Sequence, residues 1–144
     1  MPYTVSWEEP SGLYVTFRGM VTPADFARIV RSTIADPRFE HLRYTITDYL
    51  DAEGHAFTAG DLEAIAEAIA NRVHAAYTEA QVLETAVTAD PALRAFLIDY
   101  SAVVNHPVRI FSTVGAARCW LAGQAFMPRK RGLGGTSYDA MLRR

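Results

Sequence analysis

The chain has 144 residues, half of them hydrophobic, and a formal net charge of −2 at pH 7. This length suits one compact domain with a sizeable core and leaves no room for a second domain. The nearly balanced charge favours neither a polyanionic partner nor a membrane surface, so we expect no nucleic acid ligand and no membrane insertion.

The sequence also bears on localisation. No apolar run approaches the ~18 residues that cross a bilayer, and the start, Met1 to Thr4, has neither the basic region nor the apolar core of a signal peptide. A single cysteine, Cys119, cannot form an internal disulfide, which agrees with a reducing compartment. We therefore expect a cytoplasmic protein.

The first 36 residues predict a hairpin followed by a helix. Apolar and polar side chains alternate from Tyr3 to Trp7, and again from Leu13 to Phe17 after a turn at 9–12. Thr22-Pro23-Ala24-Asp25 then supplies an N-cap, a first-turn proline and a carboxylate. The helix ends at Asp36, because the residue before a proline resists the helical region.

A central strand comes next. Leu42, Tyr44 and Ile46 alternate with Arg43, Thr45 and Thr47, which predicts a half-buried strand with its threonines on the polar side. We expect residues 48–55 to form an acidic loop. Thr58 and Asp61 have the spacing of a capping box, so a helix should run from about 61 to 76.

The rest of the chain predicts two more strand and helix pairs. A strand is expected over 81–88, and Asp90-Pro91 should begin a helix that ends near 105. Residues 108–111 predict a short strand, and Ser112 or Thr113 can cap a last helix that ends before Gly123. We divide the chain into one domain, 1–122, and a basic C-terminal tail, 123–144, which carries Arg129-Lys130-Arg131.

The predicted order β-β-α-β-α-β-α-β-α indicates an α/β domain with a mixed sheet of about five strands. Strands joined through helices should be parallel, with right-handed crossovers. If the strands lie in chain order, every crossover places its helix on the same face of the sheet. Alternating strands fit such a one-sided sheet, so we expect helices mainly on one face and an uncovered face opposite.

The sequence resembles the SpoIIAA-like, STAS-type domains, which include anti-sigma factor antagonists and many bacterial proteins. The resemblance spans about 3–122, and its most specific part runs from Val108-Arg109-Ile110-Phe111 to Ala117-Arg118-Cys119-Trp120-Leu121. It implies a five-stranded mixed sheet with four helices. In regulatory members, a hydroxyl residue at the start of the helix after the central strand is phosphorylated. Here the nearest hydroxyl is Thr58, which has an ordinary role as N-cap.

Four residues form the candidate ligand-binding group. Ligands of open parallel sheets bind beyond the carboxyl ends of strands, where we expect Asp48, Asp51, His55 and Thr58. Their spacing matches neither a calcium loop nor a zinc site, so we predict no metal and no cofactor. A solvated acidic loop is the plainer interpretation.

The uncovered sheet face is the candidate interface. Its side chains mix aromatic rings with arginines, which favour interfaces, and the polar side of the central strand should lie there too. The candidates are Tyr14, Arg18, Arg43, Arg109 and Phe111, joined by Thr16, Thr45 and Thr47. This face either binds a protein, including a second copy in a homodimer, or is simply a solvated sheet.

These features favour a non-catalytic regulatory or protein-interaction module of STAS-like type, whose protein partner the sequence does not name. The alternative is a small-molecule or lipid binding domain, by analogy with related folds. An enzyme using the loop from Asp48 to His55 is a third hypothesis, and no catalytic residue is assigned. The basic tail is interpreted as a solubilising segment, with RNA or an anionic surface as the alternative ligand.

Overall fold

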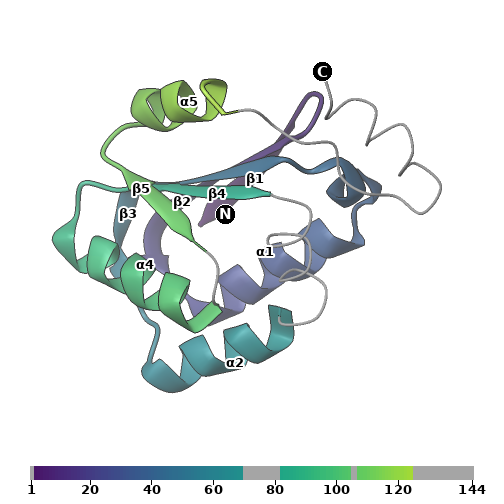
Figure 1. Cartoon of the computed structure of the whole chain (residues 1–144). Coiled ribbons are helices and arrows are strands. Elements are labelled where there is room, and N and C mark those ends of the chain that lie inside the picture. The colour runs from purple at the N-terminus through teal and green to yellow at the C-terminus, as the bar shows by residue number, and fades with distance from the viewer. Residues whose placement is uncertain (1, 70–81, 105–106, 125–144) are drawn as a thin grey trace.

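The computed structural model describes residues 2–69, 82–104 and 107–124 (Figure 1). The basic run of the predicted tail and the end of the helix predicted to reach residue 76 lie outside these residues. In chain order the elements are β1 (Tyr3–Glu8), β2 (Gly12–Val21), α1 (Pro23–Ala35), the 3-10 turn η1 (Pro37–His41), β3 (Tyr44–His55), α2 (Ala59–Ile69), β4 (Leu83–Val87), α4 (Pro91–Val104), β5 (Val108–Phe111) and α5 (Val114–Ala122).

The strands form one sheet in the order β1-β2-β3-β4-β5. β1 and β2 are antiparallel, and each later pair is parallel. This confirms the predicted mixed sheet of five strands that lie side by side in chain order.

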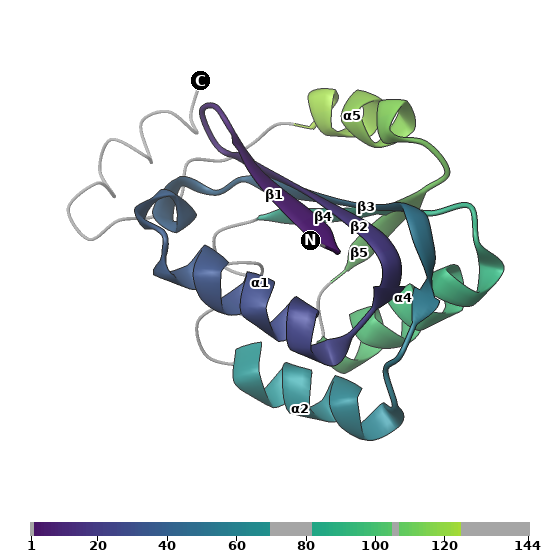
Figure 2. The same cartoon turned by 180° about the vertical axis from the view of Figure 1, so that it is seen from behind.

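The helices of the described residues lie on both faces of the sheet, with α1, α2 and α4 on one side and α5 on the other (Figures 1 and 2). α1, α2 and α4 each connect two parallel neighbours, so the right-handed rule places them on one side, here called the helix face. α5 follows β5, the last strand described, and does not connect two strands, so the right-handed rule does not determine its side. It covers part of the opposite side, here called the α5 face, so the expectation that this whole face is bare was wrong.

Each face buries its own apolar cluster. On the helix face, Leu13, Val15 and Phe17 of β2 belong to the large core, together with Ile29 of α1 and Leu97 of α4. The smaller cluster lies under α5 and consists of Ile46, Val87, Ala117 and Leu121. The sheet is therefore the middle layer between two cores of unequal size.

The pairing of β3 with β2 corrects one prediction. Thr45 is paired with Leu13 and Thr47 with Val15, so both threonines point to the helix face. Ile46 instead belongs to the cluster under α5. The prediction that Thr45 and Thr47 lie on the uncovered face was wrong. Alternation separates the two sides of a strand, but it does not say which side meets the larger helical layer.

The second half of β3 corrects another prediction. Residues 48–55, expected as an acidic loop, continue the strand and pair with β2 as far as Val21 with His55. The register shifts near Arg18 and Gly19, and Gly19 has a φ of +68°, which glycine adopts without strain. Asp51 and Glu53 are exposed on this strand, so their polarity was no guide to a loop.

The predicted helix starts are confirmed where the structure describes their caps. The Thr22 hydroxyl accepts from the Asp25 N–H at 3.2 Å, and the Thr113 hydroxyl accepts from the Ala116 N–H at 3.0 Å. The Asp90 carboxylate accepts from the Ala92 N–H at 2.8 Å. None of the helices within the described residues is long and apolar enough to cross a membrane.

Candidate functional site

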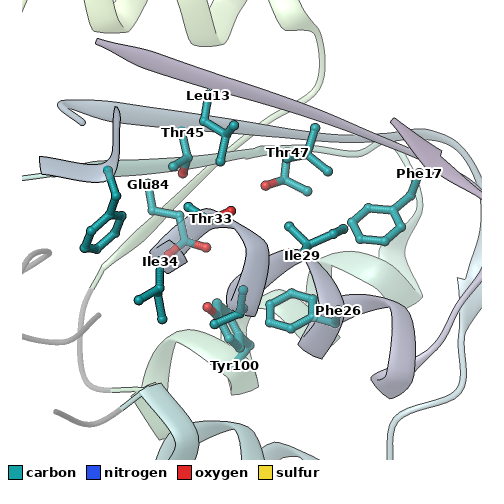
Figure 3. A pocket seen from close by; sticks show the side chains of 13 residues that line it. Leu13, Phe17, Phe26, Ile29, Thr33, Ile34, Thr45, Thr47, Glu84 and Tyr100 are labelled. Carbon is teal, nitrogen blue, oxygen red and sulfur yellow. The ribbon is translucent and has the colours of Figure 1, made fainter. Parts of the chain in front are cut away.

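A cavity of about 70 Å³ lies between the helix face of the sheet and α1 (Figure 3). Its wall is mostly apolar because β2 and α1 both turn buried side chains towards it, among them Leu13, Phe17 and Ile29. Phe26 of α1 and Tyr100 of α4 add two aromatic rings, which meet at 5.5 Å between centroids. Such an apolar hollow with a few polar groups is the usual form of a small-molecule site.

The polar groups in this wall come mainly from the middle of the sheet. Thr45 and Thr47 of β3 and Glu84 of β4 line the cavity beside Thr33 of α1. Thr45 is only 5% exposed, and its hydroxyl has no hydrogen-bond partner among the described residues. The buried hydroxyl of Thr85, by contrast, donates to the Thr45 carbonyl at 2.9 Å.

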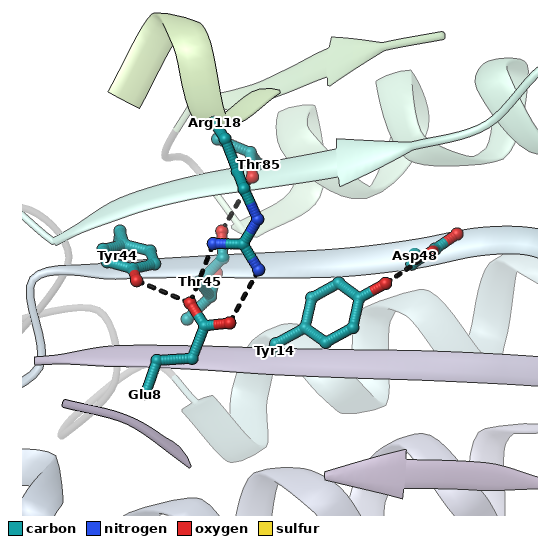
Figure 4. A network of polar contacts seen from close by, with 7 residues as sticks. All are labelled: Glu8, Tyr14, Tyr44, Thr45, Asp48, Thr85 and Arg118. Carbon is teal, nitrogen blue, oxygen red and sulfur yellow. Dashed lines mark hydrogen bonds and ion pairs between the residues drawn. The ribbon is translucent and has the colours of Figure 1, made fainter. Parts of the chain in front are cut away.

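A polar network occupies the other side of the sheet (Figure 4). The Arg118 guanidinium of α5 donates two hydrogen bonds to the Glu8 carboxylate of β1, at 3.0 and 2.6 Å. The Tyr44 hydroxyl donates to the same carboxylate at 2.6 Å. Glu8 thus joins β1, β3 and α5 at one point. The bidentate pair fixes the direction of the arginine as well as its distance.

The network also holds a second tyrosine and carboxylate. The Tyr14 hydroxyl donates to Asp48 at 2.7 Å, and the Arg118 guanidinium lies 5.5 Å from the centroid of the Tyr14 ring. Burial, and then the hydrogen bond to the Asp48 carboxylate, raises the pKa of Tyr14 to about 12. Tyr14 therefore stays protonated at neutral pH and acts as a hydrogen-bond donor.

The Glu8 carboxylate makes stability depend on pH. The hydrogen bonds from Arg118, and then that from Tyr44, hold the pKa of Glu8 below its usual range despite partial burial. This contribution is fully present above the unfolded pKa, about 4.3, and is lost as the pH falls through the lower folded value. We expect Glu8→Gln to lower the free energy of unfolding at pH 7 by about 0.5–1 kcal/mol, since the pair is partly solvated.

Urea denaturation from pH 7 to pH 2.5 measures this effect. The difference in unfolding free energy between the native chain and Glu8→Gln should shrink as the pH falls below about 4. A difference that stays constant over this range would mean that the Glu8 charge adds nothing to folding.

The predicted ligand residues lie in different surroundings in the structure. Asp48 accepts from Tyr14, and Asp51 is exposed on β3. The His55 ring stacks on Phe96 at 4.4 Å between centroids, and its Nδ1 accepts from the Phe57 N–H. No group of three or more histidine, cysteine, aspartate or glutamate side chains in the described part of the chain could hold a metal ion.

Thr58 is confirmed as the cap of α2. Its hydroxyl accepts from the Asp61 N–H at 3.1 Å, and the Asp61 carboxylate accepts from the Thr58 N–H at 2.8 Å. This reciprocal pair is the predicted capping box. A phosphate on Thr58 would meet the Asp61 carboxylate, which opposes phosphorylation as a simple switch at this residue.

Four of the five interface candidates lie on the α5 face. Tyr14 belongs to the network. The Arg109 guanidinium carbon lies 5.6 Å from the centroid of the Trp120 ring of α5, and the centroid of the Phe111 ring lies 5.9 Å from the same point. Arg18 is exposed farther along β2. Arg43 precedes β3, where its N–H donates to the Ser11 carbonyl at 2.8 Å. Tyr14, Arg109 and Phe111 therefore contact residues of α5, while Arg18 is exposed to solvent.

α5 leaves part of this face uncovered. It packs over β3, β4 and β5, and it does not cover the carboxyl-terminal half of β2 or the neighbouring part of β3. We call this surface the open face; it consists of Thr4, Thr16, Arg18, Met20 and Leu50. Met20 is 49% exposed and Leu50 is 46% exposed, although their neighbours Val21 and Tyr49 are buried in the core.

Sequence reasoning missed the cavity and the central pair of the network. Glu8 and Arg118 are 110 positions apart, and no spacing in the sequence connects them. The cavity depends on which face Thr45 occupies, and only the pairing of β2 with β3 reveals this. The alternation of threonine with apolar residues in β3 was the one available signal.

Comparisons with known proteins support the fold alone. No family model matches the chain, and no curated protein matches its sequence. A solved structure of the anti-sigma factor antagonist SpoIIAA, in its unphosphorylated form, is similar, with a TM-score of 0.59 and 7% identity. The match covers 85% of this chain and 99% of that one.

A second similar structure is an uncharacterized protein with a SpoIIAA-like fold from Shewanella loihica PV-4. It is 10% identical, has a TM-score of 0.44, and the match covers 83% of this chain and 91% of that one. Of these two matches, the one to SpoIIAA has the higher TM-score, 0.59, and it is this match that shows the fold. The chain therefore has the SpoIIAA-like fold of the STAS domains.

Proposed function

We propose that this chain is a non-catalytic regulatory module of STAS-like type that binds another protein through the open face. The fold supports this by analogy, because SpoIIAA is an anti-sigma factor antagonist. We further propose that the module is cytoplasmic and that its partner is a protein and not a nucleic acid, in keeping with the single cysteine and the net charge of −2.

The exposure of Met20 and Leu50 is the observation that carries the proposal. Both are large apolar side chains exposed on the adjacent strands β2 and β3, and the exposed Arg18 lies two residues before Met20 on β2. An apolar centre beside an arginine is the usual composition of a protein interface. The two threonines, Thr4 and Thr16, are hydrogen-bonded to each other and add a polar rim.

Site-specific photocrosslinking in the native host tests this proposal. A photoreactive phenylalanine analogue at Leu50 should give one discrete adduct, which mass spectrometry then identifies. A second copy of the chain would appear as an adduct of twice the mass. Arg18→Glu should reduce the yield of the adduct, because it reverses the charge at the edge of the apolar centre.

Ile98 supplies the matched control position. It is 54% exposed and apolar, but it belongs to α4 on the helix face. The same analogue at this position should not give the adduct obtained at Leu50. Equal yields at the two positions, or no adduct at Leu50, would contradict binding through the open face.

A further inference from the structure

The cavity under α1 combines an apolar wall with one buried hydroxyl, that of Thr45, which has no hydrogen-bond partner among the described residues. At about 70 Å³ it is several times larger than the roughly 10–15 Å³ that one ordered water requires. Leu13, Val15 and Ile29 form its apolar wall, and Thr45 projects into it from the middle of β3 (Figure 3). The space can therefore hold a small organic molecule in contact with Thr45.

The Thr45 hydroxyl is the feature that points to a ligand. Folding usually gives every buried polar group a partner, and leaving one without opposes folding. Thr85 of β4 and Thr88, which follows this strand, are also buried and do have partners: the Thr85 hydroxyl donates to the Thr45 carbonyl, and the Thr88 hydroxyl accepts from the Asp90 N–H. Thr45 is 5% exposed and its hydroxyl has no described partner.

The charge of the wall limits the class of ligand. The described lining residues include no lysine, arginine or histidine, and their single ionisable carboxyl group is that of Glu84. The described part of the wall thus supplies no cation for an anionic headgroup. An uncharged group that accepts a hydrogen bond needs no such counter-charge and suits the Thr45 hydroxyl.

From these observations we infer that the cavity binds a small uncharged molecule with an apolar body and one hydrogen-bond acceptor, such as a ketone, and that the Thr45 hydroxyl donates to this acceptor. The cavity lies on the helix face and the open face lies on the opposite side of the sheet. This inference is therefore independent of the proposed protein interface, and either can fail alone.

Methyl NMR titration of the full chain with acetone, cyclopentanone and cyclohexanone tests the inference. At least one ketone should shift the methyl signals of Leu13, Val15 and Ile29 in a saturable way. Cyclohexanecarboxylate at pH 7 and methylcyclohexane should each bind more weakly than cyclohexanone, because the first is anionic and the second has no acceptor.

Two variants of Thr45 distinguish a hydrogen bond between its hydroxyl and the ligand from an effect of the substitution on the fold. Thr45→Val keeps the shape of the side chain and should weaken ketone binding about 2- to 10-fold, while Thr45→Ser should retain it. Thr45→Val should also raise the melting temperature of the free protein, because it removes the unpartnered hydroxyl. The inference is overturned if none of the three ketones binds, if Thr45→Val leaves the affinity unchanged, or if the carboxylate binds as well as the ketone.

Discussion

Replacing Phe17 with alanine is expected to lower the free energy of unfolding by about 3–5 kcal/mol. The Phe17 ring is 2% exposed and stacks on Tyr49 at 5.3 Å between centroids, with an interplanar angle of 4°. It also forms part of the cavity wall, so its loss would enlarge a hollow that neighbouring side chains cannot fill. Urea denaturation followed by far-UV circular dichroism measures the change.

Val5 on the neighbouring strand provides the comparison. It is 38% exposed, so Val5→Ala should cost less than about 1 kcal/mol. Both variants shorten an apolar side chain on the antiparallel pair β1 and β2, but only Phe17 is in the core. Equal losses for the two variants would mean that Phe17 is not packed as described.

Leu121→Ala should lower the free energy of unfolding by about 2–5 kcal/mol, although the residue lies in the last helix that the structure describes. Leu121 is 5% exposed and packs with Ile46 and Val87 of the sheet. Its loss leaves a hollow under α5, and the helix then has less apolar contact to keep Arg118 at Glu8. Thermal and urea denaturation at pH 7 measure the loss.

The exposed Cys119 lies two residues away in the same helix and serves as the control. Cys119→Ala should change stability by less than about 0.5 kcal/mol, because it removes no buried contact. If Leu121→Ala were equally mild, α5 would not be docked on the sheet, and the network at Glu8 would lose its support.

The double variant tests whether the two cores are separate. Phe17 and Leu121 lie on opposite faces of the sheet and belong to different clusters. Their effects should therefore add to within about 0.5 kcal/mol, as they do for residues that share no contacts.

Local signals in the sequence were sufficient for the order and starts of the elements. Thr22, Thr58 and Thr113 each hold the first turn of a helix, as their spacing to the following residues predicted. The right-handed rule for crossovers then placed α1, α2 and α4 on one face. These features depend on residues close in the chain, or on a rule that applies to nearly all parallel strands.

The placement of side chains on each face could not be predicted in the same way. Thr45 was expected at the uncovered surface, and instead it lies in the cavity beside Leu13. The apolar side of β3 meets α5, a helix that no crossover rule could place. The error concerns the face that one strand presents and not the order of the strands, so the assignment of the fold stands.

Long-range pairs explain the remaining gap between sequence and structure. The bond from Arg118 to Glu8 joins the last helix to the first strand, and it exists only after the whole sheet has formed. The open face similarly depends on how far β2 and β3 run together beyond α5, which is fixed by pairing around Gly19 and not by composition.

The network, the open face and the position of Thr45 all require a sheet with two differently covered faces, and methyl nuclear Overhauser spectroscopy tests this arrangement most directly. We predict cross-peaks from the methyl groups of Leu121 to those of Ile46 and Val87, and none from Leu121 to Val15, which lies on the helix face. Cross-peaks between Leu121 and Val15, without those to Ile46 and Val87, would place α5 on the other side of the sheet and contradict the network, the open face and the position of Thr45.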